Sequence, residues 1–154
     1  MGISYRKAEY RDMEDLRRLI REYVGSMGLD LSFQGLDEEL DSLPGKYAEP
    51  DGALIVACEG DELCGCIALR RLDEGVCEMK RLFVRDSHKG MGIGRELARR
   101  IVEEAGIKGY KAMRLDTLSS MKAALALYRS LGFRETSPYI YNPIEGAVYM
   151  EKSL

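Results

Sequence analysis

Hydrophobic positions along this chain of 154 residues follow two periods, and the places where the period changes predict the secondary structure. Alternating or unbroken apolar runs, typical of strands, occupy residues 3–8, 53–59, 62–72, 76–84, 111–118, 132–139 and 146–154. Apolar positions three or four residues apart, typical of amphipathic helices, occupy residues 13–27, 36–43, 94–105 and 121–131. This order of elements predicts an α/β fold.

The turns between these elements predict how the sheet is connected. Short segments rich in glycine and acidic residues, 60–61 and 73–75, divide residues 53–84 into three strands, which favours an antiparallel meander. Neither a repeat nor a linker interrupts the chain. We therefore expect a single domain over residues 1–154, with a mixed sheet and helices on both faces.

The charge balance limits the partners of the protein. Lys and Arg number 23 against 26 Asp and Glu, and the net charge of −3 disfavours nucleic acid or an anionic membrane as a partner. No apolar stretch approaches the roughly 18 residues of a membrane span, and the charged N-terminal stretch is unlike a signal peptide. We expect a cytoplasmic location.

The cysteines do not indicate a disulfide framework or a metal site. Cys58, Cys64, Cys66 and Cys77 lie in strand-like segments of a chain long enough to fold without disulfides, so free thiols are expected. A zinc site would need Cys-x-x-Cys spacing or several histidines, whereas the chain has Cys-x-Cys and the single residue His88. We expect no metal.

Three glycines that alternate at Gly90, Gly92 and Gly94 stand between a strand-type run and an amphipathic helix. Glycine lets the backbone approach a ligand closely, and a helix N-terminus adds partial positive charge, so this segment predicts an anion cradle made of backbone amides. A dinucleotide fingerprint would need glycine where Arg95 or Leu97 stands, and a P-loop would need a Gly-Lys-Ser/Thr that is absent. The alternative is a glycine-rich loop that only starts the helix.

Two motifs point to a known family. Residues 89–94, Lys-Gly-Met-Gly-Ile-Gly, fit the pattern Arg/Gln-x-x-Gly-x-Gly/Ala except for lysine at the first place. Residues 121–133 fit Asn-x-x-Ala-x-x-Leu-Tyr-x-x-x-Gly-Phe except that Met121 replaces Asn. With these motifs in this order, the chain resembles the GNAT superfamily of acetyl-CoA-dependent N-acetyltransferases, and the order of its elements resembles that superfamily over almost the whole length.

The resemblance implies a mostly antiparallel sheet with a splayed pair of parallel strands, 76–84 and 111–118, and acetyl-CoA between them. It implies that the pantetheine arm pairs with the main chain of the first strand and that amides of the glycine loop hold the pyrophosphate, with side-chain contacts from Lys89 and Arg95. The residues expected to bind acetyl-CoA are Leu82, Phe83, Val84, Lys89, Gly90, Met91, Gly92, Ile93, Gly94 and Arg95.

Amine acetylation also needs a proton for the departing thiolate. Tyr128 can supply it, because a phenol with a pKa near 10 is protonated at neutral pH. The resemblance implies the same role for the tyrosine of the Leu-Tyr motif. The alternative for Tyr128 is a core aromatic on the helix face that it shares with Leu125 and Leu131.

Glu78 is the candidate base. Strand alternation groups it with Leu82 and Val84, next to the expected cofactor, and the resemblance implies that a glutamate at this place directs a water to the substrate ammonium. The alternative is a surface carboxylate paired with Lys80. His88 is expected to meet solvent or phosphate, and no histidine is positioned to activate Cys77 as an acyl carrier.

The acceptor is expected between two regions, 27–41 and 137–146. Their polar and aromatic members, suited to a cationic amine, are Asp30, Phe33, Gln34, Asp37, Glu38, Tyr139, Tyr141 and Asn142. We expect direct transfer from acetyl-CoA to a primary amine, most simply of a small molecule. A protein or peptide acetyltransferase and a non-catalytic acyl-CoA sensor are the alternatives, and family habit predicts a homodimer.

Overall fold

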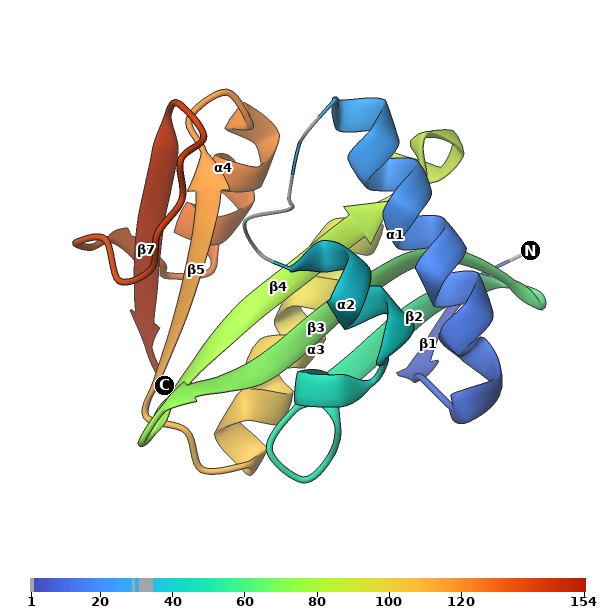
Figure 1. Ribbon diagram of the computed structural model, residues 1–154, viewed down its shortest axis with the longest axis horizontal. Coiled ribbons are helices and arrows are strands. Elements are labelled where there is room, and N and C mark those ends of the chain that lie inside the picture. The colour runs from blue at the N-terminus through green and yellow to red at the C-terminus, as the bar shows by residue number, and fades with distance from the viewer. Residues whose placement is uncertain (1, 29, 31–34) are drawn as a thin grey trace.

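A computed structural model describes residues 2–28, 30 and 35–154, and within them one seven-stranded sheet forms the centre of the molecule (Figure 1). Its strands are β1 (Ile3–Lys7), β2 (Ala53–Glu59), β3 (Glu62–Asp73), β4 (Val76–Val84), β5 (Ala112–Leu118), β6 (Arg134–Glu135) and β7 (Ala147–Ser153). They lie in the order β1-β2-β3-β4-β5-β7-β6. The described strand pairs are antiparallel except β4–β5. The sequence-based prediction of a mixed sheet is confirmed.

Helices cover both faces of this sheet. They are α1 (Met13–Met27), α2 (Leu36–Asp41), α3 (Ile93–Ile107) and α4 (Lys122–Ser130), with short 3-10 turns η1 (Tyr10–Asp12), η3 (Gly45–Tyr47) and η4 (Asp86–His88). Elements α1, α2 and η3 pack on one face, and α3 and α4 pack on the other. The longest described helices, α1 and α3, have 15 residues each, and no helix in the described ranges is both long and apolar enough to cross a membrane.

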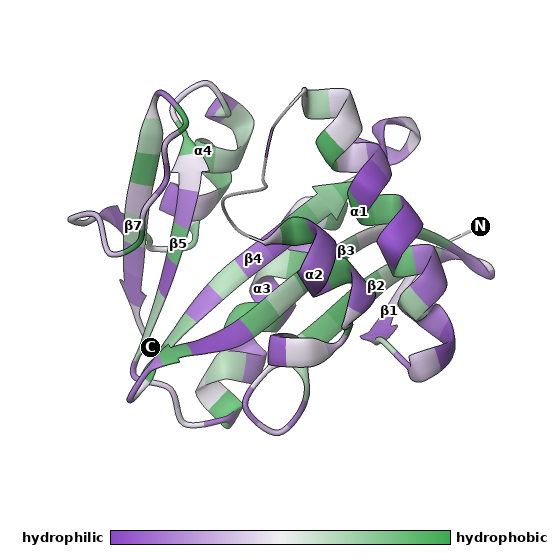
Figure 2. Cartoon of the chain, viewed as in Figure 1, coloured by the Kyte–Doolittle hydropathy of each residue, from purple (hydrophilic) through white to green (hydrophobic). Residues whose placement is uncertain are grey.

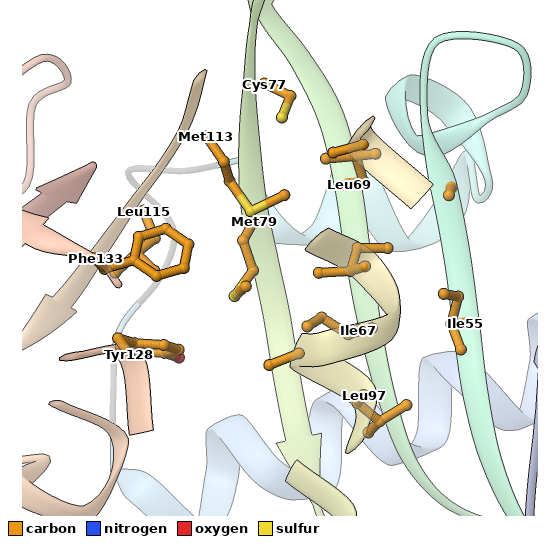
Figure 3. Close-up of a cluster of buried hydrophobic side chains, with 14 of the residues drawn as sticks. Ile55, Ile67, Leu69, Cys77, Met79, Leu97, Met113, Leu115, Tyr128 and Phe133 are labelled. Atoms are coloured by element: carbon orange, nitrogen blue, oxygen red, sulfur yellow. The ribbon is translucent and has the colours of Figure 1, made fainter. Parts of the chain in front are cut away.

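Each face has its own hydrophobic core. Leu16 and Ile20 of α1 are buried against β2 and β3, while the exposed side of α1 carries hydrophilic residues (Figure 2). On the opposite face, Leu97 of α3 packs near Ile67 and Leu69 of β3 (Figure 3). Burying a side chain of this kind contributes roughly 1.5–3 kcal/mol, so these two layers fix the sheet from both sides.

The parallel strands β4 and β5 separate soon after they pair. Their register covers only Val76–Glu78 against Ala112–Arg114, and beyond these residues the two strands diverge (Figure 1). The predicted splayed pair is therefore confirmed. The main-chain edge of β4 that follows the split faces the gap instead of a neighbouring strand, which leaves it free to pair with a ligand.

A bulge in β4 overturns the alternation expected for this strand. Ala68 pairs with Lys80 and Cys66 pairs with Phe83, so β4 holds one extra residue, and Arg81 adopts a φ of 59°. Before the bulge Glu78 and Lys80 point to the α1 and α2 face, but after it Leu82 packs on the α3 and α4 face. The prediction that Glu78 shares a face with Leu82 and Val84 is wrong for this reason.

The end of the chain is less regular than predicted. The strand expected over 132–139 is reduced to Arg134–Glu135, and an irregular segment leads from it to β7. Pro138 and Pro143 lie in this segment, and proline has no N–H to donate to a strand ladder. The segment instead folds back toward β4 and β5, where Tyr139 and Asn142 make side-chain hydrogen bonds.

Candidate active site

Two hollows meet where β4 and β5 diverge. The glycine-loop groove, of about 980 Å³, lies between the end of β4, the N-terminal end of α3 and the start of α4. The splay cavity, of about 120 Å³, lies between β4 and β5 and is walled by α1 and by Asn142 and Ile144. Both hollows are lined by Tyr23, Leu82, Met121 and Tyr128.

The glycine-loop groove has the geometry of an anion site. Gly92 caps α3 with φ of 78°, Gly90 has φ of 80°, and a Cβ atom added at either residue would meet nothing within 4 Å. The first amides of α3 therefore lie beside open space, where a helix N-terminus favours negative charge. Of the predicted cofactor residues, Leu82, Val84, Lys89, Gly90, Gly92, Ile93, Gly94 and Arg95 line the groove.

The other two predicted cofactor residues lie differently. Met91 is about half exposed on the loop and is not part of the groove wall. Phe83 turns to the opposite face, where its ring stacks on Tyr23 with centroids 4.0 Å apart. This reversal follows from the bulge in β4.

Cationic side chains border the groove. Lys89 pairs with Asp86 at 2.8 Å and lies 5.9 Å from the ring centre of Tyr23. Arg95 is exposed and makes no ion pair with any residue that the structure describes. His88 also lines the groove, where its Nε2 lies 3.3 Å from Glu59. The groove thus combines backbone amides with cationic side chains.

Tyr128 stands between the two hollows. It is the seventh residue of α4, it is 8% exposed, and its ring meets Phe133 edge to face. Its hydroxyl forms no hydrogen bond with the described residues. Burial raises the pKa of Tyr128 above the usual 10, and the nearby carboxylate of Asp116 raises it further, so the phenol keeps its proton well beyond neutral pH.

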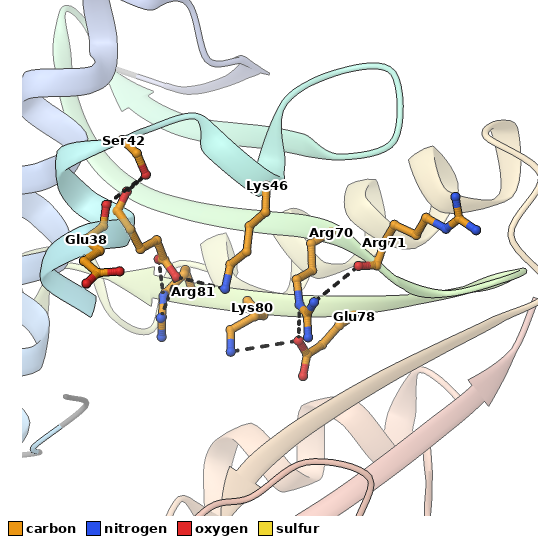
Figure 4. A network of polar contacts seen from close by, with 9 residues as sticks. Glu38, Ser42, Lys46, Arg70, Arg71, Glu78, Lys80 and Arg81 are labelled. Carbon is orange, nitrogen blue, oxygen red and sulfur yellow. Dashed lines mark hydrogen bonds and ion pairs between the residues drawn. The ribbon is translucent and has the colours of Figure 1, made fainter. Parts of the chain in front are cut away.

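Glu78 is fully buried and does not line the splay cavity. Its Oε1 accepts a hydrogen bond from Arg70 Nε at 2.7 Å and lies 3.9 Å from Lys80 Nζ (Figure 4). Its Oε2 accepts a hydrogen bond from the Tyr139 hydroxyl at 2.6 Å. The surface alternative for Glu78 does not hold, although the expected pairing with Lys80 is present. Its carboxylate therefore contacts three side chains, of which Lys80 lines the cavity.

The bulge places two cations side by side on the wall of the splay cavity. Lys80 and Arg81 are both buried, and both line the cavity. Arg81 donates from Nε and Nη2 to the carboxylate of Glu39 on α2 at 2.8 and 2.9 Å, which holds the bulge in place. Burial lowers the pKa of Lys80, and Glu78 opposes that shift. Sequence reasoning missed these residues because strict alternation sends Arg81 to the other face.

The opposite wall of the cavity carries a carboxylate. Asp116 of β5 lines the cavity, and its Oδ2 accepts a hydrogen bond from Asn142 at 3.0 Å. Asn142 is itself fixed, because its Oδ1 accepts a hydrogen bond from the N–H of Ile144. The signal that could have found Asp116 is an acidic residue in the second strand of the parallel pair, just past the split.

The acceptor regions expected from the sequence contribute unequally. Asn142 lines the cavity, but Tyr141 is largely exposed and Tyr139 is held by Glu78. From the first region, Asp37 is exposed and lies 4.0 Å from Arg21, and it is Glu39 that reaches the site. Phe33 and Gln34 lie outside the described residues.

The thiols and carboxylates do not form an alternative centre. All four cysteines are buried and free, and burial raises the pKa of Cys77 to about 12, which disfavours a nucleophilic thiolate. Among the described residues no group of three or more His, Cys, Asp or Glu side chains could hold a metal ion.

Comparison with known proteins identifies the class of this fold and site. The PaiA N-acetyltransferase of Thermoplasma acidophilum, solved in complex with coenzyme A, superposes with a TM-score of 0.79 over 100% of both chains at 20% identity. The fold is thus that of N-acetyltransferases. The model of the acetyltransferase (GNAT) family matches residues 13–133, and the chain belongs to this family.

Sequence relatives agree with this assignment. An uncharacterized N-acetyltransferase of Schizosaccharomyces pombe is 41% identical over 91% of this chain and 87% of its own length. The N-acetylaspartate synthetase of Danio rerio is 34% identical over 68% of this chain and 39% of its own length. The protein is an acetyl-CoA-dependent N-acetyltransferase.

Proposed function

We propose that the protein transfers the acetyl group directly from acetyl-CoA to a primary amine of a small molecule. The observation that carries this proposal is the size and shape of the splay cavity. Its volume of about 120 Å³ is well below the roughly 300–1,000 Å³ of sites for drug-sized ligands. The cavity is bounded by α1, β4, β5 and the 142–144 segment, which favours a compact acceptor.

The main chain of β4 supports the expected seat of the pantetheine arm. The N–H of Arg85 donates to Cys64 of β3 at 2.9 Å. Because backbone groups of successive strand residues point to opposite edges, those of Leu82 and Val84 point away from β3, toward the gap between β4 and β5. A pantetheine amide can pair there as a short extra strand.

The geometry of the glycine loop supports the expected position of the pyrophosphate. Amides of residues 89–94 supply the donors, and Gly92 leaves the space that the phosphate oxygens need. Arg95 and Lys89 add side-chain charge at the rim. In this arrangement the thioester end of acetyl-CoA points along β4 toward Tyr128.

We propose Tyr128 as the general acid. After the amine attacks the thioester carbonyl and the tetrahedral intermediate collapses, the C–S bond breaks and the sulfur takes a proton from the phenol. The raised pKa of Tyr128 keeps that proton available, and the resulting phenolate is short-lived because solvent or the newly formed amide nitrogen returns a proton.

We propose Glu78 as the base, acting through Tyr139 and a water molecule. Both oxygens of Glu78 already accept hydrogen bonds, Oε2 from Tyr139 and Oε1 from Arg70, so the acceptor ammonium does not transfer its proton to them directly. The ammonium instead gives a proton to a water, and the water gives a proton to the Tyr139 oxygen. Tyr139 then transfers its own hydroxyl proton to Glu78. Glu78→Gln and Tyr139→Phe should then lower kcat by similar factors and change the acid side of its pH profile. Loss of thermal stability with unchanged kcat in both variants would contradict the relay.

The test of the proposed function is an assay of CoA thiol release over a panel of small amines, with lysine-containing and free N-terminal peptides as competitors. The expected result is turnover with small amines that the peptides do not suppress. Efficient transfer to peptides alone would favour the protein-directed alternative. Acetyl-CoA binding by calorimetry without any turnover would indicate a sensor, and either result would overturn the proposal.

The location and assembly also remain proposals. We propose a cytoplasmic homodimer in which the β7 edge contributes the interface, because β6 covers only two residues of β7, Met150 and Glu151. An uncovered strand edge is a natural template for pairing with another chain. Sedimentation at micromolar concentration should show the dimer, and a monomer would remove the proposal.

A further inference from the structure

The two opposite walls of the splay cavity carry side chains of opposite charge. On the β4 wall stand Lys80 and Arg81, and on the β5 wall stands Asp116. A ligand with a negative charge at one end and a positive charge at the other would match the charges of both walls. A neutral amine or a simple cation would satisfy only the Asp116 wall.

The cationic wall formed by Lys80 and Arg81 can bind an anionic group. In the described part of the chain, Glu78 is shared by Arg70 and Lys80, and Glu39 is shared by Arg81 and Lys46. Lys80 Nζ lies 3.9 Å from Glu78, which is ion-pair range but longer than a hydrogen bond, and the closer contact to that carboxylate belongs to Arg70 at 2.7 Å. Among these described residues, four cations therefore share two carboxylates, which leaves this wall with a net positive charge.

The anionic wall lies at the reacting end. Asp116 lines the splay cavity together with Tyr128 and Lys80. Asn142 fixes one oxygen of Asp116. The other oxygen forms no hydrogen bond to the described residues, so it can accept one from an ammonium held near Tyr128.

From this arrangement we infer that the acceptor is an amine that also carries a carboxylate, such as a free amino acid, with its ammonium toward Asp116 and its carboxylate toward Lys80. The inference rests on the proposed transfer to a small amine and names the class of that amine. It differs from the cationic acceptor expected from the sequence, because Lys80 and Arg81 would repel a ligand with positive charge at both ends.

The experiment compares free amino acids with their carboxamides as acceptors, since each pair differs only in the carboxylate. A neighbouring carboxylate stabilises the ammonium form, so amine reactivity alone favours the carboxamide. The wild-type protein should nevertheless prefer the best amino acid by about tenfold or more in kcat/KM, because the carboxamide offers no negative charge to the cationic wall.

Substitutions in the two walls test which charged residue causes the preference for an amino acid over its carboxamide. Lys80→Met should reduce the acid-to-amide ratio about tenfold or more while leaving the KM for acetyl-CoA unchanged, and Lys80→Arg should keep the preference. Asp116→Asn should lower kcat/KM for acid and amide by similar factors, because both carry the ammonium. Lys111→Met, at an exposed position away from both hollows, is the matched control and should change nothing.

Each outcome is informative. Equal rates on acids and amides in the wild-type protein would overturn the inference while the proposed function stands, and this comparison needs no variant to fold. A wild-type preference that persists in folded Lys80→Met would overturn the role of Lys80. Turnover with peptides and with no small amine would overturn the proposed function first, and the inference with it.

Discussion

At the scale of single residues, the role that we propose for Tyr128 requires that it keep its proton beside the two hollows. Its ring is packed against Phe133, while its hydroxyl is left without a hydrogen bond to the described residues. A core tyrosine normally finds a partner for its hydroxyl, so this open position favours a role in proton donation over one in packing alone. The motif that contains Tyr128 locates the residue, and the structure shows where its hydroxyl lies.

Replacement of Tyr128 by Phe should lower kcat by about 10²–10⁴-fold, the usual contribution of a general acid. The KM for acetyl-CoA should change little, because the phenyl ring retains the packing. Because burial raises the pKa of Tyr128, the wild-type kcat should show no loss from phenol ionisation up to about pH 10. Steady-state thiol release across pH measures both effects, and full activity of the variant would exclude the acid role.

Sequence patterns located Glu78 but not its surroundings. Alternation is reliable only while the ladder is regular, and one extra residue at Arg81 turns the later side chains of β4 to the other face. The pairing of Arg81 with Glu39 joins elements 42 residues apart, so local spacing carries no signal for it. For the same reason Lys80 and Asp116 could be assigned to a common cavity only in three dimensions.

At the scale of elements, the N-terminal end of α3 is the expected anchor for the phosphates. Gly92→Ala should weaken acetyl-CoA binding about tenfold, because an L residue at a φ of 78° costs about 1–2 kcal/mol and its Cβ enters the space beside the amides. Gly106→Ala, in the last turn of the same helix with nothing within 4 Å, is the control and should leave binding unchanged. Calorimetry compares the two, and equal affinities would contradict the cradle.

A second element-level contact ties β1 to the start of α1. Arg6 donates two hydrogen bonds to the buried carboxylate of Asp12, at 2.6 and 2.9 Å, and this pairing lowers the pKa of Asp12 below its ordinary 3.8. The stabilisation is therefore complete well above pH 3.8 and is lost as the pH falls through the lower folded-state value.

Asp12→Asn should accordingly reduce the free energy of unfolding by about 1.5–3 kcal/mol at pH 7, as expected for a charged hydrogen bond. The difference from the wild-type protein should shrink as the pH approaches 3 and below. Urea unfolding at several pH values measures it, and a difference that does not change with pH would contradict the assigned pairing.

Long periodic elements were predictable and the C-terminal region was not. The stripes of α1 and α3 contain enough turns for their apolar period to be clear, and both helices form where expected. In contrast, the strand expected over 132–139 contains Pro138 and becomes an irregular segment whose position depends on distant partners, Glu78 and Asp116. Contacts between residues far apart in sequence decided that region.

At the scale of the whole molecule, an acidic chain of net charge −3 binds a strongly anionic donor. This requires local attraction, which we propose comes mostly from backbone amides, with Arg95 as an added charge at the rim. Arg95→Ala should weaken acetyl-CoA binding a few-fold and make the affinity less sensitive to salt, because exposed charges are screened within about 10 Å at 0.1 M ionic strength. Titrations at low and high salt measure this, and an unchanged salt dependence would exclude Arg95 from the site.

The splay between β4 and β5 unites these scales, since it opens the cavity proposed for the acceptor beside the edge proposed to receive acetyl-CoA. The most direct test supplies the wild-type protein with acetyl-CoA and a small amine that carries a carboxylate, and quantifies free CoA together with the N-acetylated product by mass spectrometry. The account predicts the two products in equal amounts, with both greatly reduced in Tyr128→Phe. Free CoA without an acetylated amine, or no turnover of any small amine, would contradict it.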